Sequence, residues 1–367
     1  MSTTSNKLYF THPPPLSPTW LAHEKATGLN LPKPIITNPL KRRENYEKAC
    51  SELNKILLSG RDEYLNHGLE VRDTFIPSTL VAGHEIPVRV YTPHPTAPHP
   101  QPPTNPQTKN ESETVNGVIL NPPKKPQILY LHGGGLVLGS PHTEDLTCRR
   151  ISLSLSVTVY SIAYRLLPEH SADEALSDAL SAFRYLTTAY PEDGVVVVGS
   201  SSGGQLAGQV VQVVLREEGG DRDGRRIKGV VLRGPVLCDA TNLDFLPERF
   251  RGVHTSLSTP FYTSLLSIPA LTPENRTVTP LPLEFAISNL SKLPPHQPKH
   301  YIQVCTNDIY YSDGVLYAEI LREQGVDVRL DVVVGYPHTF WLKAPFLERA
   351  VRAEGDMLGG LRWILEG

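Results

Sequence analysis

A run of four valines that leads directly into a turn of glycine and serine is the feature that most restricts the fold of this chain. Residues 195–198 are all valine, and residues 199–203 read Gly-Ser-Ser-Ser-Gly. Consecutive β-branched residues favour a buried strand, whereas apolar residues recur at helical spacing over 205–220. A Gly-x-Ser-x-Gly turn between a strand and a helix is a nucleophile elbow, because the sharp turn lifts the middle hydroxyl clear of the sheet. The pattern therefore predicts a nucleophilic Ser201 in an α/β fold with a mostly parallel central sheet and helices on both faces.

A second glycine cluster lies upstream, directly after the apolar run of residues 127–131. It reads His132-Gly133-Gly134-Gly135. Successive glycines let the main chain turn its amides toward a substrate and approach it without Cβ atoms in the way, as an oxyanion hole requires. On this segment alone, a flexible glycine hinge is the alternative. Beside the elbow, the cluster predicts an oxyanion loop.

The other members of a serine triad should follow the nucleophile in the order acid, then histidine, each after a later strand. Asp308 comes shortly after the strand-like run 301–305, where a carboxylate can reach an imidazole. His338 lies in a loop between the strand-like run 327–334 and the last helix. Asp313 is a rival acid, although it falls inside the helix expected after the first run. We predict a triad of the elbow serine, Asp308 and His338.

Six blocks of sequence, in order and at similar spacing, give the chain a family resemblance over residues 70–367. It resembles the hormone-sensitive-lipase-like group of α/β-hydrolase esterases. The blocks are IPVRVYTP from Ile86, LHGGGLVLGSPHTEDLTCRRIS from Leu131, YRLLPEHSADEALSDAL from Tyr164, VVVVGSSSGGQLAG from Val195, CTNDIYYSDG from Cys305 and GYPHTF from Gly335.

The resemblance implies a carboxylic-ester hydrolase that works through an acyl-enzyme and needs no metal and no organic cofactor. It makes Ser201 the nucleophile, Asp308 the orienting acid and His338 the base. It assigns the oxyanion hole to the backbone amides of Gly134, Gly135 and Ser202. The substrate would be a small or medium uncharged ester.

The chain departs from the family pattern at two places, beside the predicted nucleophile and after the predicted triad carboxylate. Ser200 and Ser202 replace the usual aspartate and alanine of the elbow, and Ile309-Tyr310-Tyr311 replaces Pro-Leu-Arg. None of these changes removes a catalytic group, because Ser202 would act through its backbone amide. They put the shape of the pocket in doubt rather than the triad.

The resemblance implies that the chain is divided into a cap-forming start and a hydrolase domain. We expect an N-terminal cap-forming segment over residues 1–60, which includes a helix over 39–59, and an α/β-hydrolase domain over 61–367. That domain carries a proline-rich insertion at 93–126 and a cap insertion at about 239–298. The proline-rich insertion should be a solvated excursion between two strands.

Charge and cysteine usage exclude several classes of partner. Lys and Arg number 35 and Asp and Glu 38, which gives a net charge of −3 and predicts no nucleic-acid partner. The four cysteines are isolated and none has metal-ligand spacing, so we expect buried free thiols. No signal peptide and no run of about eighteen apolar residues occurs, which predicts a cytoplasmic protein without a membrane segment. A homodimer remains open.

Two alternatives to ester hydrolysis stay open from the sequence. Some relatives of this fold use the same pocket for elimination, cyclisation or acyl transfer on natural products, as secondary metabolism requires. The gibberellin receptor resembles these esterases and binds a ligand, but it has lost the catalytic histidine, whereas His338 is present here. We also expect the segment from Tyr164 to Glu169 to hold the oxyanion loop in place, with Arg165 and Glu169 as an ion pair that supports the scaffold.

Overall fold

The fold is built on one mostly parallel sheet. The computed structural model describes residues 8–31, 36–94, 125–217, 226–239, 243–257, 277–289 and 297–366. Within these, eight strands lie in the order β1-β2-β4-β3-β5-β6-β7-β8, and only the β1–β2 and β2–β4 pairs are antiparallel. The strands are β1 (Leu69–Pro77), β2 (Glu85–Pro93), β3 (Gln127–Leu131), β4 (Val159–Ile162), β5 (Val195–Ser200), β6 (Ile227–Arg233), β7 (Lys299–Cys305) and β8 (Val328–Val333).

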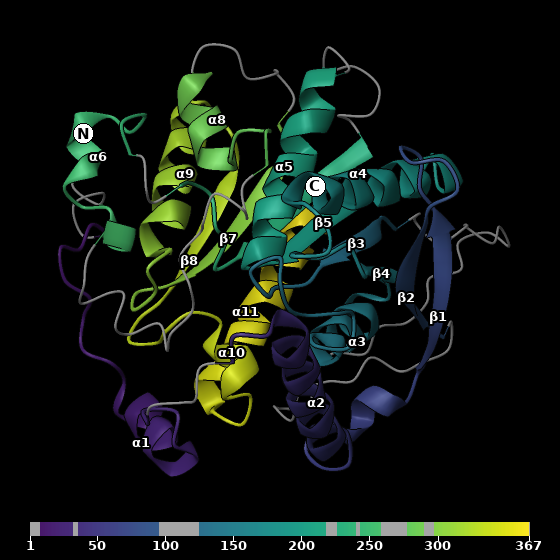
Figure 1. The fold of residues 1–367 in the computed structure, drawn as a ribbon, viewed down its shortest axis with the longest axis horizontal. Helices are drawn as coiled ribbons and strands as arrows, with labels where there is room; N and C mark the ends of the chain where they lie inside the picture. Colours follow the sequence, from purple (N-terminus) through teal and green to yellow (C-terminus); the bar gives the residue numbers. More distant parts are fainter. Residues whose placement is uncertain are drawn as a thin grey trace, which may run out of the picture.

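Helices cover both faces of this sheet, as the sequence predicts (Figure 1). The helices are α1 (Pro18–Thr27), α2 (Pro39–Leu58), α3 (Asp145–Leu155), α4 (Ala172–Ala189), α5 (Ser202–Glu217), α6 (Glu248–Arg251), α8 (Pro282–Ser288), α9 (Tyr311–Glu323), α10 (Phe340–Lys343) and α11 (Glu348–Leu365), with short 3₁₀ turns η2 (Glu63–Asn66) and η4 (Thr255–Leu257). The helix expected over 39–59 is confirmed as α2.

The central strand β5 shows why the core has two layers. Val195 and Val197 belong to the apolar cluster that contains residues of α4, α5 and α9. Val196 and Val198 belong to the cluster on the other face, with residues of α3 and α11. Successive side chains of a strand point to opposite faces, so an unbroken valine run suits a strand that is covered on both sides.

Parallel strands bring the predicted site residues to one edge of the sheet. The glycine loop follows β3, the elbow follows β5, and Asp308 and His338 follow β7 and β8. Because these four strands run in the same direction, all four segments leave the sheet at its carboxyl edge, where open α/β sheets bind ligands. In Figure 1, α10 lies between α1 and α2, and α2 lies beside α3.

The ion pair expected between Arg165 and Glu169 was a wrong prediction. Arg165 instead binds Asp178 at 2.8 Å and Glu174 at 2.7 Å, both on α4. Glu169 pairs at 2.9 Å with Arg43 of α2. The partners of Arg165 lie on α4 and the partner of Glu169 lies on α2. No local spacing in the sequence predicts these pairs.

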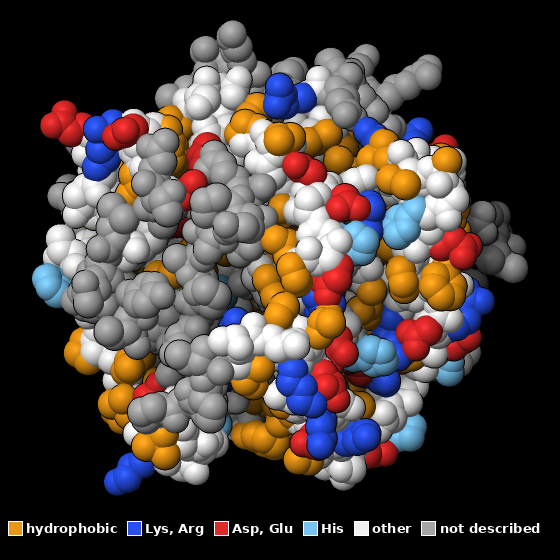
Figure 2. Space-filling view, in the orientation of Figure 1, with side chains coloured by type: hydrophobic (Ala, Val, Ile, Leu, Met, Phe, Trp, Pro, Cys, Tyr) orange, Lys and Arg blue, Asp and Glu red, His pale blue; other side chains and the backbone are white. Residues whose placement is uncertain are grey.

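Lys and Arg side chains are interspersed with Asp and Glu on the face shown in Figure 2, so its described residues form no broad field of one charge. Among the described residues, no helix combines the length and the apolar character needed to cross a membrane.

Replacing residues 95–124, which lie outside the described residues, by a six-residue linker should leave the fold intact. The end of β2 and the start of β3 lie on opposite sides of β4. Tyr91, near the end of β2, and Ile128, near the start of β3, both pair with Val159, the first residue of β4. The linker must therefore span about two strand spacings, roughly 10 Å, which six residues reach easily.

We expect the melting temperature of this variant to stay within about 5 °C, because loop-closure free energy varies slowly with length. Thermal unfolding measures this. An aggregated or non-cooperative variant would show that the insertion belongs to the folded core.

Candidate active site

The turn around Ser201 has the strained geometry of a nucleophile elbow. Ser201 has a φ of +53°, which L-residues with side chains rarely adopt. Its amide donates to the carbonyl of Arg233 at 2.8 Å. A Cβ atom on Gly199 would lie 2.1 Å from the Gly203 carbonyl oxygen, and one on Gly203 would lie 2.0 Å from that of Leu131. Glycine is therefore required on both sides of the serine.

Ser201, His338 and Asp308 form one chain of hydrogen bonds. The Ser201 Oγ lies 2.8 Å from His338 Nε2, and His338 Nδ1 lies 2.5 Å from Asp308 Oδ2. The other carboxylate oxygen of Asp308 accepts the Tyr310 amide at 2.9 Å, and the Tyr310 ring packs edge-on against the imidazole at 5.4 Å. All three side chains are buried, Ser201 being the most exposed at 8%.

The rival acid Asp313 lies elsewhere. It is in the first turn of α9, where its Oδ2 accepts the amides of Leu237 and Cys238 at 2.8 and 3.2 Å. The structure thus brings Asp308 to His338, and it places Asp313 in a separate polar cluster.

The glycine loop has positive φ at two successive glycines, and side chains bind the backbone amides on either side of them. Gly134 and Gly135 have φ values of +136° and +65°, and the Gly133 amide turns instead to the Glu144 carboxylate at 2.7 Å. The Ser202 hydroxyl accepts the Leu136 amide at 3.2 Å. Because the amides of Gly133 and Leu136 are bound by side chains, the loop conformation is fixed on both sides of Gly134 and Gly135.

Glu144 is a site residue that the sequence analysis missed. Its second oxygen accepts the Tyr130 hydroxyl at 2.5 Å, and only 3% of the residue is exposed. Burial raises the pKa of Glu144, against the hydrogen bonds from Tyr130 and the Gly133 amide, which lower it. Because its two oxygens accept hydrogen bonds from Tyr130 and from the Gly133 amide, Glu144 holds the start of the glycine loop against β3. No spacing rule marks it in the sequence.

Tyr164 and His132 fix the base of the same loop. The Tyr164 hydroxyl donates to the His132 carbonyl at 2.7 Å, and the two rings stack at 4.3 Å. Burial lowers the pKa of His132 to about 4, so this imidazole is neutral at ordinary pH. The prediction that the segment around Tyr164 holds the glycine loop in place is confirmed.

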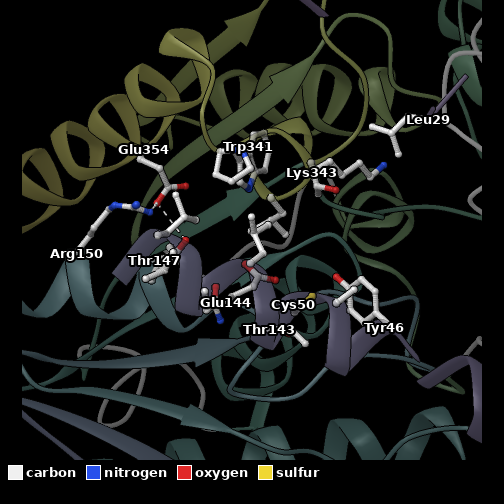
Figure 3. A pocket seen from close by; sticks show the side chains of 18 residues that line it. Leu29, Tyr46, Cys50, Thr143, Glu144, Thr147, Arg150, Trp341, Lys343 and Glu354 are labelled. Atoms are coloured by element: carbon white, nitrogen blue, oxygen red, sulfur yellow. Dashed lines mark hydrogen bonds and ion pairs between the residues drawn. The ribbon is translucent and has the colours of Figure 1, made fainter. Parts of the chain in front are cut away.

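Two neighbouring cavities open at the site. The catalytic cavity, about 180 Å³, is bounded by the glycine loop, the elbow, Val236 and Tyr310, together with Arg42 and Tyr46 of α2. The second cavity, about 300 Å³, lies beneath α2 and is shown in Figure 3. Both are lined by Tyr46, Thr339, Leu342 and Lys343, so the two cavities adjoin.

The second cavity has apolar walls and a polar end. Leu53 and Leu57 of α2 and Trp341 are among its walls. At the other end Thr147 and Arg150 reach toward Glu354, at 3.1 and 3.5 Å (Figure 3). Burial would raise the pKa of Glu354, but Arg233 and Arg150 hold it below its ordinary value. The polar end is thus a set of compensated charges rather than an isolated acid.

Comparison with known proteins places this geometry in a family. A family model described as the alpha/beta hydrolase fold matches residues 128–342, more than half of the chain. The versiconal hemiacetal acetate esterase stcI of Emericella nidulans is 29% identical over 275 residues, which are 70% of this chain and 91% of that protein. The FAD-linked oxidoreductase pytB of Aspergillus terreus is 30% identical over 73% of this chain, but the chain spans only 34% of its length.

Solved structures show the same fold. The hyperthermophilic esterase from the archaeon Pyrobaculum calidifontis matches with a TM-score of 0.65 and 26% identity, over 96% of this chain and 99% of that one. Vibralactone cyclase matches with a TM-score of 0.72 over 96% and 95%, and at 20% identity its likeness concerns the fold alone. The chain belongs to the hormone-sensitive-lipase-like family of α/β hydrolases, and its class is that of the serine esterases.

The contacts of the two acids predict effects of very different size for the same substitution. Asp308→Asn should lower kcat by a factor on the order of 10⁴, because an amide cannot hold the imidazole in the required tautomer. Asp313→Asn should lower kcat by less than about tenfold, because its partners, the amides of Leu237 and Cys238 and the side chains of Cys238 and His254, do not belong to the triad. Steady-state kinetics on p-nitrophenyl acetate measure both, and the reverse order would make Asp313 the triad acid.

Proposed function

We propose that this protein hydrolyses small or medium uncharged carboxylic esters with Ser201 as nucleophile, His338 as general base and Asp308 as orienting acid. The observation that carries the proposal is the continuous hydrogen-bonded chain from Ser201 through His338 to Asp308, at 2.8 and 2.5 Å. Leu136, Val236 and Tyr310, which line the cavity beside the nucleophile, are uncharged, whereas Arg42 and Lys343 of the same lining carry positive charge.

The reaction follows from these positions. His338 Nε2 takes the hydroxyl proton as Ser201 Oγ bonds to the ester carbonyl carbon, and Asp308 stabilises the imidazolium. The amides of Gly134, Gly135 and Ser202 hold the tetrahedral oxyanion. The imidazolium then protonates the leaving alcohol as its bond to carbon breaks. Water, deprotonated by the same base, releases the acid and restores Ser201.

We further propose that the N-terminal segment 1–60 and the region 239–298 form a cap over this site. Support comes from α2, because Arg42 and Tyr46 line the catalytic cavity. Residues 240–242, 258–276 and 290–296 of the second region lie outside the described residues.

Ser201→Ala should abolish ester hydrolysis, with a loss in kcat on the order of 10⁶ and an unchanged melting temperature. Ser200→Ala is the matched control, because among the described residues the buried Ser200 hydroxyl has no hydrogen-bond partner. It should retain most of the activity. An organophosphorus inhibitor should label Ser201 in the wild type, and mass spectrometry locates the adduct.

Reaction in ¹⁸O-labelled water separates hydrolysis from the alternatives. A hydrolase transfers one solvent oxygen to the released acid, whereas an elimination, a cyclisation or acyl transfer to another alcohol does not. A receptor-like module would show ligand binding without turnover. Wild-type turnover by Ser201→Ala would contradict the proposed nucleophile.

The second cavity suggests which half of the ester is bulky. His338 must deliver its proton to the leaving oxygen, so the alcohol half lies on the imidazole side of the nucleophile. Thr339, the next residue, lines both cavities. We propose that the alcohol half enters the second cavity and that ring-sized alcohols are accepted there.

Hydrogen bonds near both ends of α2 support the view that the second cavity is a defined feature of the fold and not a packing defect. Near its start, Arg43 donates to the carbonyls of Val137 and Leu167 at 3.0 and 2.8 Å. Near its end, Asn54 donates to the His142 carbonyl at 2.8 Å and Leu57 is buried. The helix is therefore fixed near both ends while its middle spans the space.

Leu53→Trp, which fills the second cavity, should lower kcat/KM for 2-naphthyl acetate by about tenfold or more, as size mismatches in a pocket do. Ethyl acetate, with its small alcohol, should be hydrolysed within about threefold of the wild-type rate. The control Ile56→Trp changes the outer face of α2, where Ile56 is 59% exposed, and should affect neither ester. A selective loss on ethyl octanoate instead would assign the cavity to the acyl half.

A further inference from the structure

Three metal-ligating side chains that take no part in the triad meet in one buried cluster. Cys238 follows β6, His254 directly precedes η4, and Asp313 lies in the first turn of α9. Their exposed fractions are 1%, 4% and 1%. His254 and Asp313 are 16 and 75 positions from Cys238 in the sequence, so the three residues form no recognisable sequence motif. None of the three lines the catalytic cavity or the cavity beneath α2.

The distances between the three ligand atoms are close to the edges of one face of a coordination tetrahedron, two of them being slightly shorter. Cys238 Sγ lies 3.2 Å from His254 Nε2 and 3.5 Å from Asp313 Oδ1, and His254 Nε2 lies 3.2 Å from Asp313 Oδ1. Zinc bonds of about 2.3 Å to sulfur and about 2.0–2.2 Å to nitrogen and oxygen give tetrahedral edges of about 3.3–3.6 Å. A charge-assisted bond from imidazole to carboxylate would be shorter, about 2.7–2.9 Å.

Outer partners hold two of the ligands in the orientation that a metal needs. The other ring nitrogen of His254, Nδ1, lies 2.5 Å from the Ser256 hydroxyl. The other oxygen of Asp313 accepts the Leu237 and Cys238 amides. Nε2 and Oδ1 are thereby turned to the thiol, and hydrogen bonds of this kind are usual around metal-bound histidine and carboxylate.

Charge and ligand type narrow the choice of ion. A thiolate, a carboxylate and a neutral imidazole carry a charge of −2, which a divalent cation neutralises, so that burial leaves no net charge uncompensated. A sulfur, nitrogen and oxygen set suits Zn²⁺ or Co²⁺ and not Mg²⁺ or Ca²⁺, which prefer oxygen alone.

We propose that Cys238, His254 and Asp313 bind one Zn²⁺ at a site distinct from the catalytic triad. On binding, the Cys238 thiol releases its proton to the solvent and the sulfur bonds to the metal, and water completes the four ligands. The ion would tie the loop after β6 and the start of α9 to residues 254–257, at the base of the region assigned to the cap. The sequence predicts no metal, and the proposed ester hydrolysis needs none.

A Co²⁺ titration of the full-length chain, stripped by a chelator and dialysed, tests the site. We expect one equivalent to bind with the near-ultraviolet absorption of a cobalt–thiolate bond, and Zn²⁺ to displace it. Cys238→Ser should lose this band and bind at least about a hundredfold more weakly. Cys148→Ser is the matched control, because Cys148 is also buried and free, and it should bind as the wild type does.

Binding of equal strength in Cys238→Ser, or no saturable binding in the wild type, would overturn the proposal and leave a hydrogen-bonded cluster. If Cys238→Ser does not fold, alkylation of the wild type in moderate denaturant replaces it, read by mass spectrometry at Cys238 and Cys148. Zinc should slow alkylation of Cys238 more than of Cys148. Equal slowing at both cysteines would count against the site.

Discussion

The close approach of two backbone segments fixes the geometry on which the site depends. Gly203, at the start of α5, lies so near β3 that a Cβ atom there would come within 2.0 Å of the Leu131 carbonyl oxygen and 2.4 Å of that of His132. The elbow and the glycine loop are therefore held at one separation by backbone contact rather than by adjustable side chains. The nucleophile and the amides proposed to bind the oxyanion are positioned before any substrate arrives, which is what electrostatic preorganisation requires.

Buried polar groups beneath the loop complete this arrangement. Glu144 accepts the Gly133 amide, while Arg233, whose carbonyl accepts the Ser201 amide, bonds to Glu354 at 2.7 Å and stacks on Trp341 at 4.2 Å. Each of these side chains would cost free energy if it were buried alone, and each has a partner. The polar network under the site is therefore part of what holds the backbone of the elbow and of the glycine loop.

The sequence predicts the parts of this structure that follow from local pattern. The valine run, the glycine spacing and the order of strand ends were enough to expect the α/β-hydrolase fold, and they singled out Ser201, Asp308 and His338, which the structure brings together. The partners of Arg165 and Glu169 were mispredicted, and Glu144 was missed. The cluster of Cys238, His254 and Asp313 was also missed, because those contacts join segments that are adjacent only after the sheet and its helices have packed. Long-range side-chain pairing has no periodicity or spacing for a single sequence to display.

The hydrogen bonds of α2 connect the N-terminal segment to the backbone beside the glycine loop. Arg43 belongs to the N-terminal segment, yet it donates to the carbonyl of Val137, two residues beyond the last glycine of the loop. A helix imported from a relative without a guanidinium at this position would leave that carbonyl and the Leu167 carbonyl without their donor. Exchange of the segment before about residue 60 would therefore alter the residues of α2 that line the cavity together with the backbone contacts beside Ser201.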